Sequence, residues 1–155
     1  MRLEQINVYA QHYTVNMHDF KYCVWLTTDN DCIWSTYTNG FKPHLTIKSH
    51  LSFEEAFSLQ NEISSNFHKP LDIYLEGDII NSKAPDFHAL LFKAKLGEGL
   101  IKPHWWVEDA HVSFYYDYNE ISDSVKEEVT KTVKTKKAVF DKIEVKLCAG
   151  HFRKW

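Results

Sequence analysis

The sequence predicts an α+β domain, in which antiparallel strands are joined by short turns and two amphipathic helices pack outside them. Stretches rich in β-branched and aromatic residues alternate with clusters of turn residues. Two further stretches place apolar residues at helical spacing behind a favourable N-cap residue. The length of 155 residues and the hydrophobic content of 44% fit one folded domain spanning residues 1–155.

The first half of the chain predicts three strands and one helix. Asn39-Gly40 is a hairpin signal between two of the strands. Ser52 is a favourable N-cap, and Glu55 three residues later completes a capping box, so a helix begins here. The three strands are expected at residues 6–15, 21–28 and 44–49.

The second half of the chain predicts mainly strands, because after Pro70 the apolar residues alternate with polar ones. A second helix begins at Ser122 or Asp123 and extends to residue 136, and one or two strands follow it to the C-terminus. Residues 96–106 are expected as a short helix or a loop. The other strands are expected at residues 71–80, 87–96 and 110–118.

Composition and charge limit the functional classes. The net charge of −3 argues against a protein that coats long nucleic acid, which needs a basic face to displace many counterions. A small anionic ligand remains compatible, because a few local cations are enough for it. No apolar run is long enough for a signal peptide or a membrane span, and three cysteines form no paired framework. We expect a cytoplasmic protein with neither a membrane nor an obligatory protein partner.

A four-residue pattern occurs twice in the chain. His44-Leu45-Thr46-Ile47 and His111-Val112-Ser113-Phe114 both place a histidine two residues before a hydroxyl residue. Residues i and i+2 of a strand point to the same face, so each histidine projects together with its hydroxyl neighbour. If the two strands are neighbours, two imidazoles and two hydroxyls share one space.

Such a group of side chains suits the cleavage of a phosphodiester. One histidine takes the proton of the attacking hydroxyl or water, and the other protonates the leaving oxygen. The hydroxyls of Thr46 and Ser113 donate hydrogen bonds to the phosphate as charge builds on its oxygens. This chemistry requires no metal or other cofactor, and the spacings of the remaining histidines and cysteines do not fit a typical zinc module.

The two motifs resemble the signature of the two-histidine (2H) phosphoesterase superfamily, which has two copies of His-x-Thr/Ser-x with hydrophobic x. This resemblance implies a two-lobed, pseudo-symmetric fold with antiparallel sheets around a central cleft and helices outside. Within the superfamily, the compact length and the aromatic-rich N-terminal half look most like phage proteins that degrade cyclic oligonucleotide signals and so counteract CBASS, a bacterial defence. The stretches LEQINVYAQHY and AGHFRKW contribute to this resemblance. The resemblance therefore implies cleavage of 3'-5' bonds in cyclic di- or trinucleotides, in the cytoplasm of an infected bacterium, with His44, Thr46, His111 and Ser113 as catalytic residues.

Recognition of such a ligand requires aromatic rings for its bases and hydrogen-bond acceptors for its amines. The candidates are Tyr13, Trp34, Tyr74 and Glu144. For the aromatic residues the alternative is packing in the core, and for Glu144 it is a solvated charge at a sheet edge. Two other functions stay open at this point. One is a 2H enzyme acting on 2'-5' oligoadenylates or RNA 2',3'-cyclic phosphates, and the other is a sponge that binds cyclic nucleotides without cleaving them.

Overall fold

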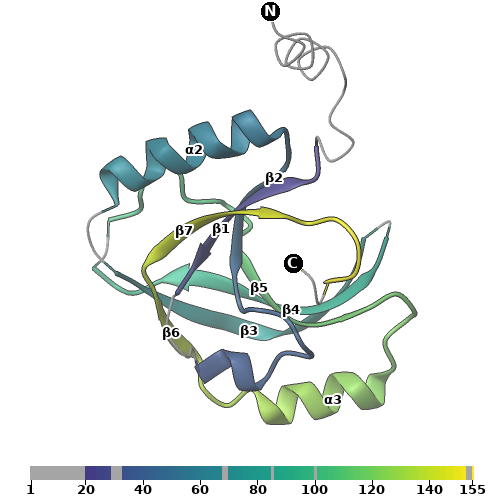
Figure 1. Cartoon of the computed structure of the whole chain (residues 1–155). Helices are drawn as coiled ribbons and strands as arrows, with labels where there is room; N and C mark the ends of the chain where they lie inside the picture. The colour runs from purple at the N-terminus through teal and green to yellow at the C-terminus, as the bar shows by residue number, and fades with distance from the viewer. Residues whose placement is uncertain (1–19, 29–32, 68–69, 85, 100, 153–154) are drawn as a thin grey trace, which may run out of the picture.

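The computed structural model describes residues 20–28, 33–67, 70–84, 86–99, 101–152 and 155. In this part of the chain, seven antiparallel strands form one sheet, accompanied by two α-helices and a 3-10 helix (Figure 1). The predicted strand at 6–15 lies outside the described residues. The elements are β1 (Tyr22–Thr27), η1 (Ile33–Thr36), β2 (Leu45–Leu51), α2 (Phe53–Asn66), β3 (Leu71–Lys83), β4 (His88–Leu96), β5 (His111–Asp117), α3 (Asp123–Thr132), β6 (Lys137–Phe140) and β7 (Lys142–Leu147).

The strand order makes the two motif strands neighbours at the middle of the sheet. The order is β6-β3-β4-β5-β2-β1-β7, and each neighbouring pair is antiparallel. β2 and β5 pair through Leu45 and Val112. The sequence predicts antiparallel sheets in the plural, whereas this pairing joins all the described strands into a single sheet.

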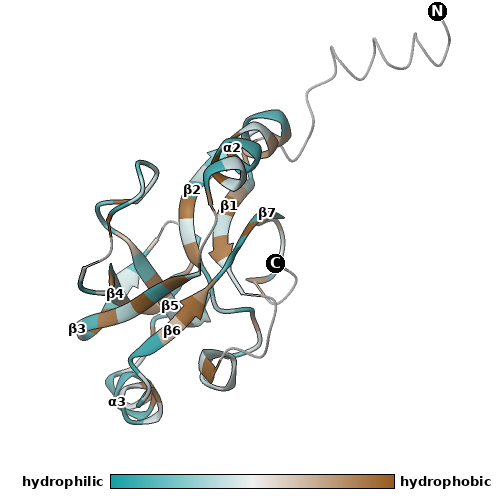
Figure 2. Ribbon diagram, turned by 90° about the vertical axis from the view of Figure 1, so that its left-hand side faces the viewer, coloured by the Kyte–Doolittle hydropathy of each residue, from teal (hydrophilic) through white to brown (hydrophobic). Residues whose placement is uncertain are grey.

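One face of the sheet forms the main hydrophobic core. Figure 2 shows that hydrophobic and hydrophilic residues alternate along the strands, as expected for strands with one buried face. The core side of the sheet carries Leu45, Ile47 and Val112, all buried. Both helices add to this core, with Ile63 from α2 and Val129 from α3. Each fully buried aliphatic side chain of this kind stabilises the fold by about 1.5–3 kcal/mol.

Local sequence signals fix where the two helices begin. Ser52 and Glu55 form the predicted capping box: the Ser52 hydroxyl accepts from the Glu55 backbone, and the Glu55 carboxylate accepts from the Ser52 backbone. The Ser122 hydroxyl likewise accepts from the backbone of Val125 at the start of α3. α2 lies over β7, β1 and β2, and α3 lies against β3. None of the described helices is long and apolar enough to cross a membrane.

A second, smaller aromatic cluster packs beside the second motif. Phe41, Tyr116 and Phe152 are buried in it together with Ala89. The ring of Phe152 packs against both Phe41 and Tyr116, with centroids 6.0 and 5.5 Å apart. The segment after β7 therefore returns to the motif strands and closes over the end of β5.

Candidate active site

The structure brings the two His-x-Thr/Ser motifs together. His44 precedes β2 directly, and His111 is the first residue of β5. Continuing the register of the Leu45–Val112 pair places His44 opposite Ser113 and Thr46 opposite His111. Because Leu45 and Val112 point into the core, these four side chains project from the other face of the sheet. The two histidines are then diagonal neighbours, typically about 7–8 Å apart in an antiparallel pair.

Both imidazoles are oriented by the same kind of contact. Nδ1 of His44 lies 2.8 Å from the carbonyl oxygen of Lys42, and Nδ1 of His111 lies 3.0 Å from that of Asp109. A carbonyl oxygen only accepts, so in each ring Nδ1–H is the donor. This contact leaves Nε2 of each histidine to exchange a proton with a ligand, which is the arrangement that acid-base chemistry needs.

The surroundings of the two histidines differ. The His44 side chain is buried, with only 4% of its surface exposed, whereas His111 is half-buried. The ring of His44 stacks on Trp25, with centroids 3.5 Å apart and planes at 7°. Burial lowers the pKa of His44 to about 4, aided by the positive charges of His111, Lys146 and Lys42 and opposed by the hydrogen bond to the Lys42 carbonyl. His44 is therefore neutral at physiological pH and able to accept a proton.

The two hydroxyl residues also lie in different surroundings. Ser113 is buried and makes a side-chain hydrogen bond with Tyr116, while Thr46 is half-buried on β2. Burial raises the pKa of Tyr116 to about 12, so the phenol stays protonated and can donate to the Ser113 oxygen. In that arrangement the Ser113 hydroxyl proton is available for a ligand oxygen.

Glu144, predicted as a ligand-binding residue, is part of an ion pair beside His44. Its Oε2 accepts from Nζ of Lys42 at 2.7 Å and from Oγ1 of Thr27 at 2.5 Å. Partial burial by itself raises the pKa of Glu144, but the hydrogen bonds from Lys42 and Thr27 outweigh it and the pKa is lowered overall. Glu144 is therefore a carboxylate that already holds two donors.

The other predicted ligand-binding residues have separate outcomes. The prediction that Trp34 binds the ligand is wrong. Its side chain is 0% exposed and packs edge-on against Phe114 and Phe140. Its Nε1–H donates to the Thr135 carbonyl at 2.7 Å. A buried ring with a satisfied donor belongs to the core. Tyr74 is half-buried on β3 between the core residues Ile73 and Leu75, so it points to the same face as His111. Tyr13 lies outside the described residues.

Three contacts of the two motifs were not found from the sequence. Trp25 supports the His44 ring, Lys42 orients it through its carbonyl, and Tyr116 binds Ser113. Trp25 belongs to a strand that is buried on both faces. Its residues therefore do not alternate between apolar and polar, and the sequence does not show to which face the Trp25 side chain points. Lys42 and Tyr116 are within three residues of a motif, and this proximity was the one available signal.

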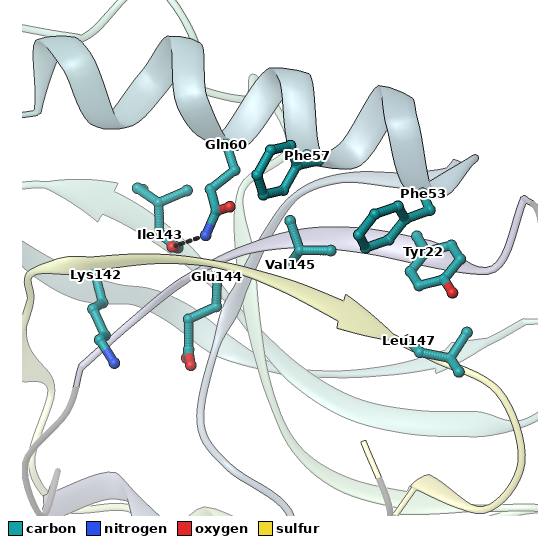
Figure 3. Close-up of a pocket in the computed structure, with 9 residues that line it drawn as sticks. All are labelled: Tyr22, Phe53, Phe57, Gln60, Lys142, Ile143, Glu144, Val145 and Leu147. Carbon is teal, nitrogen blue, oxygen red and sulfur yellow. Dashed lines mark hydrogen bonds between the residues drawn. The ribbon is translucent and has the colours of Figure 1, made fainter.

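A groove between α2 and β7 lies on the other face of the sheet. Phe53 and Phe57 of α2 line it together with Tyr22 of β1 (Figure 3). In the same view the Glu144 side chain points away from α2, whereas Val145 points toward it. The groove is thus separated from the histidines by the strands themselves. Among the described residues, no group of three or more His, Cys, Asp or Glu side chains is arranged to hold a metal ion.

Comparison with known proteins supports the fold. No protein-family model matches the sequence, and no curated protein sequence matches it. The structure of Usb1 from Kluyveromyces marxianus, solved with uridine monophosphate, superposes on it with a TM-score of 0.52. The two chains are 14% identical, and the match covers 87% of this chain and 97% of Usb1. The protein therefore shares the α+β fold of Usb1.

Proposed function

We propose that the protein is a metal-independent phosphodiesterase of the two-histidine type, which cleaves 3'-5' bonds in small cyclic oligonucleotides. The observation that carries this proposal is the convergence of His44, Thr46, His111 and Ser113 on one face of two adjacent strands. Both imidazoles are held by Nδ1 and direct the same nitrogen at a ligand. An acid-base pair of this kind acts on a phosphodiester without further groups.

The asymmetry of the site assigns the two roles. His44 is neutral because its pKa is about 4, so it is the base that takes the proton of the attacking hydroxyl, either the ribose 2'-hydroxyl or water. His111 is then the acid that protonates the leaving 5'-oxygen. Thr46 and Ser113 donate to the non-bridging oxygens, where charge builds as the new bond to phosphorus forms.

A two-lobed arrangement with a cleft between the lobes belongs to the same proposal. β2 is followed by α2, and β5 is followed by α3, so each motif strand leads into a capped helix. The short β2–β5 pairing joins one group of strands, β6, β3, β4 and β5, to the other, β2, β1 and β7. A substrate that lies across this junction contacts both motifs at once.

A cyclic di- or trinucleotide fits the charge of this face. The net charge of the protein is −3, and the cations next to His44 are Lys42 and Lys146. A few cations suffice for two or three phosphates, but not for a long polyanion. In an infected bacterium this activity would remove the signals of CBASS. Tyr74, on the same face as His111, is the candidate contact to a base.

A second candidate is cleavage at RNA ends or 2'-5' linkages, and the comparison with Usb1 favours it. That structure was solved with uridine monophosphate, a single nucleotide, and the fold is shared. The acid-base geometry is the same for both substrate classes, so the substrate has to be determined by experiment.

The test is incubation of the wild type and of His44→Ala and His111→Ala with cyclic di- and trinucleotides, 2'-5' oligoadenylates and RNA 2',3'-cyclic phosphates, all in EDTA. We expect linear products from a cyclic substrate with wild type, and at least about 10²-fold slower cleavage by either variant. Products are identified by mass spectrometry.

Three other outcomes contradict the proposal. Loss of wild-type cleavage in EDTA would contradict metal independence. Cleavage restricted to 2'-5' or RNA substrates would establish the second candidate. Binding of a cyclic nucleotide that is recovered intact would identify a sponge.

A further inference from the structure

We propose that the ion pair between Glu144 and Lys42 is a positioning device for His44. This inference rests on the proposed function, because it assumes that His44 acts on a substrate. It assigns Glu144 to the orientation of the base rather than to recognition of a nucleobase. The residues act through His44 and do not themselves touch the reacting atoms.

A chain of short contacts links Glu144 to the imidazole. Glu144 binds the side chain of Lys42 at 2.7 Å, and the carbonyl oxygen of the same lysine holds Nδ1 of His44 at 2.8 Å. Lys42 precedes β2 in a segment that has no regular secondary structure. Its side-chain contact with β7 therefore anchors the backbone atom that fixes the tautomer and the direction of the His44 ring.

The same two strands hold the other side of the imidazole. Trp25 of β1 stacks on the His44 ring, and its partner in the register of β7 is Glu144. Thr27, two residues further along β1, donates to the same carboxylate oxygen that Lys42 binds. His44 is thus held directly by the Trp25 ring of β1, and by Glu144 of β7 through Lys42.

This ion pair differs from the others in length and burial. The side chains of Lys42 and Glu144 are 34% and 20% exposed. The three other ion pairs among the described residues are 3.6 to 3.7 Å long, with side chains between 42% and 71% exposed. Short, charge-assisted contacts that are shielded from water fix geometry better than exposed ones. His111 has no such support, since the side chain of Asp109 is exposed and forms no ion pair in the described part of the chain.

Loss of the pair should reduce turnover more than binding. In Glu144→Gln or Lys42→Met the Lys42 carbonyl remains, but its segment loses the anchor on β7. His44 then spends less time in the productive orientation, and a misplaced catalytic group costs up to about 10²-fold in rate. We expect kcat to fall about 10- to 100-fold in each variant, with KM changed less than about threefold in Glu144→Gln, which keeps both lysines.

The two variants also have opposite electrostatic effects on His44. The charged groups that act on this histidine are Lys42, Lys146 of β7 and His111 of β5, and the Glu144 carboxylate binds Lys42. Without the charge of Glu144, the two lysines act uncompensated and the acidic limb of kcat/KM moves to lower pH. Without the charge of Lys42, one of the cations that lower the pKa of His44 is gone and the limb moves to higher pH. A purely structural role of the pair would not produce shifts of opposite sign.

The experiment measures steady-state kinetics as a function of pH on the substrate that the wild type cleaves. It compares the wild type with Glu144→Gln, Lys42→Met, the double variant and Lys42→Arg. Glu127→Gln is the matched control, since it makes the same change in the exposed Glu127–Lys131 pair of α3. We expect the double variant to lose no more than the worse single variant, Lys42→Arg to recover most of the activity, and the control to match the wild type. An increase in KM at constant kcat for Glu144→Gln would overturn the inference and make Glu144 a substrate-binding residue.

A second measurement keeps the inference testable if the wild type cleaves none of the substrates, an outcome that would refute the proposed function. Long-range proton–nitrogen NMR spectra report which nitrogen of His44 carries the proton. We expect one tautomer, protonated at Nδ1, in the wild type and in Glu127→Gln, and a mixture in Glu144→Gln. Identical His44 spectra in all three proteins would refute the positioning role by itself.

Discussion

The burial of His44 determines where the proposed activity is lost in acid. Its pKa is lowered from the ordinary histidine value of 6.5 to about 4, first by desolvation and then by neighbouring cations. A base is active when deprotonated, so kcat/KM should stay constant as the pH falls below 6 and decline only near pH 4. The measurement is kcat/KM of the wild type from pH 3.5 to 8, at constant ionic strength. An acidic limb centred near 6.5 would show that His44 is not the base.

For single residues, the sequence predicts those members of the site whose position follows from a local rule. His44 and Thr46, like His111 and Ser113, share a face because they are two residues apart on a strand, and this needs no knowledge of the fold. Trp25 and Glu144 are different. Trp25 reaches His44 because β1 lies next to β2, and Glu144 reaches Lys42 because β7 lies next to β1. This order of strands is not written in any short stretch. Trp34 was misassigned for the same reason, since its burial depends on β6 and the segment before it packing against the ring.

Among the elements, the start of α2 offers a test of stability that is independent of catalysis. Ser52→Ala removes the hydroxyl that accepts from the Glu55 backbone and leaves this donor at the helix end without its partner. We expect a loss of about 1 kcal/mol in the free energy of unfolding. Urea denaturation at pH 7 measures it, and kcat should be unchanged because α2 packs on the face opposite the histidines.

Ser65→Ala is the matched control for this prediction. Ser65 lies in the last turn of α2, where its exposed hydroxyl donates to the Glu62 carbonyl of the same helix. Its removal leaves no cap unsatisfied, so the free energy of unfolding should change by less than about 0.5 kcal/mol. An equal loss in both variants would mean that Ser52 contributes no more than any helical serine.

Element boundaries were predicted well where the signal is local and poorly where another element decides. Ser52 is the N-cap that the sequence predicts, and Ser122 is one of the two residues that it offers for the second helix. The helix expected up to residue 136 ends at Thr132, because the Lys136 carbonyl accepts from the Leu75 backbone and Lys137 begins the strand that pairs with β3. Likewise β3 continues to Lys83, three residues beyond the expected end, since it stays paired with β4 as far as His88.

Across the whole molecule, the sequence predicts the α+β class but not the single sheet. Alternating apolar residues specify that strands exist and which face is buried. They do not specify that β7, the last strand, forms one edge beside β1, or that β6 forms the other edge beside β3. These long-range pairings bring Glu144 to Lys42, a contact between residues 102 positions apart. The support of the site is therefore a property of the assembled sheet.

The same assembly makes the stability of the whole protein depend on the protonation of His44. In the folded protein its pKa is about 4, whereas in the unfolded chain it returns to about 6.5. Between these values the unfolded state binds the extra proton, so the free energy of unfolding falls as the pH decreases from 6.5 to 4. A shift of this size corresponds to about 3 kcal/mol, lost across that window and fully present above pH 6.5.

The comparison with His44→Gln isolates this contribution, because glutamine does not titrate. Urea denaturation of both proteins at pH 7, 5.5 and 4 gives the free energy of unfolding of each. We expect the wild type to lose about 3 kcal/mol more than the variant between pH 7 and pH 4, since the other titrating groups are common to both. Parallel losses in the two proteins would mean that His44 is protonated as easily in the fold as in the unfolded chain. In that case burial against Trp25 would not keep the imidazole neutral, and its role as the base would lose its physical support.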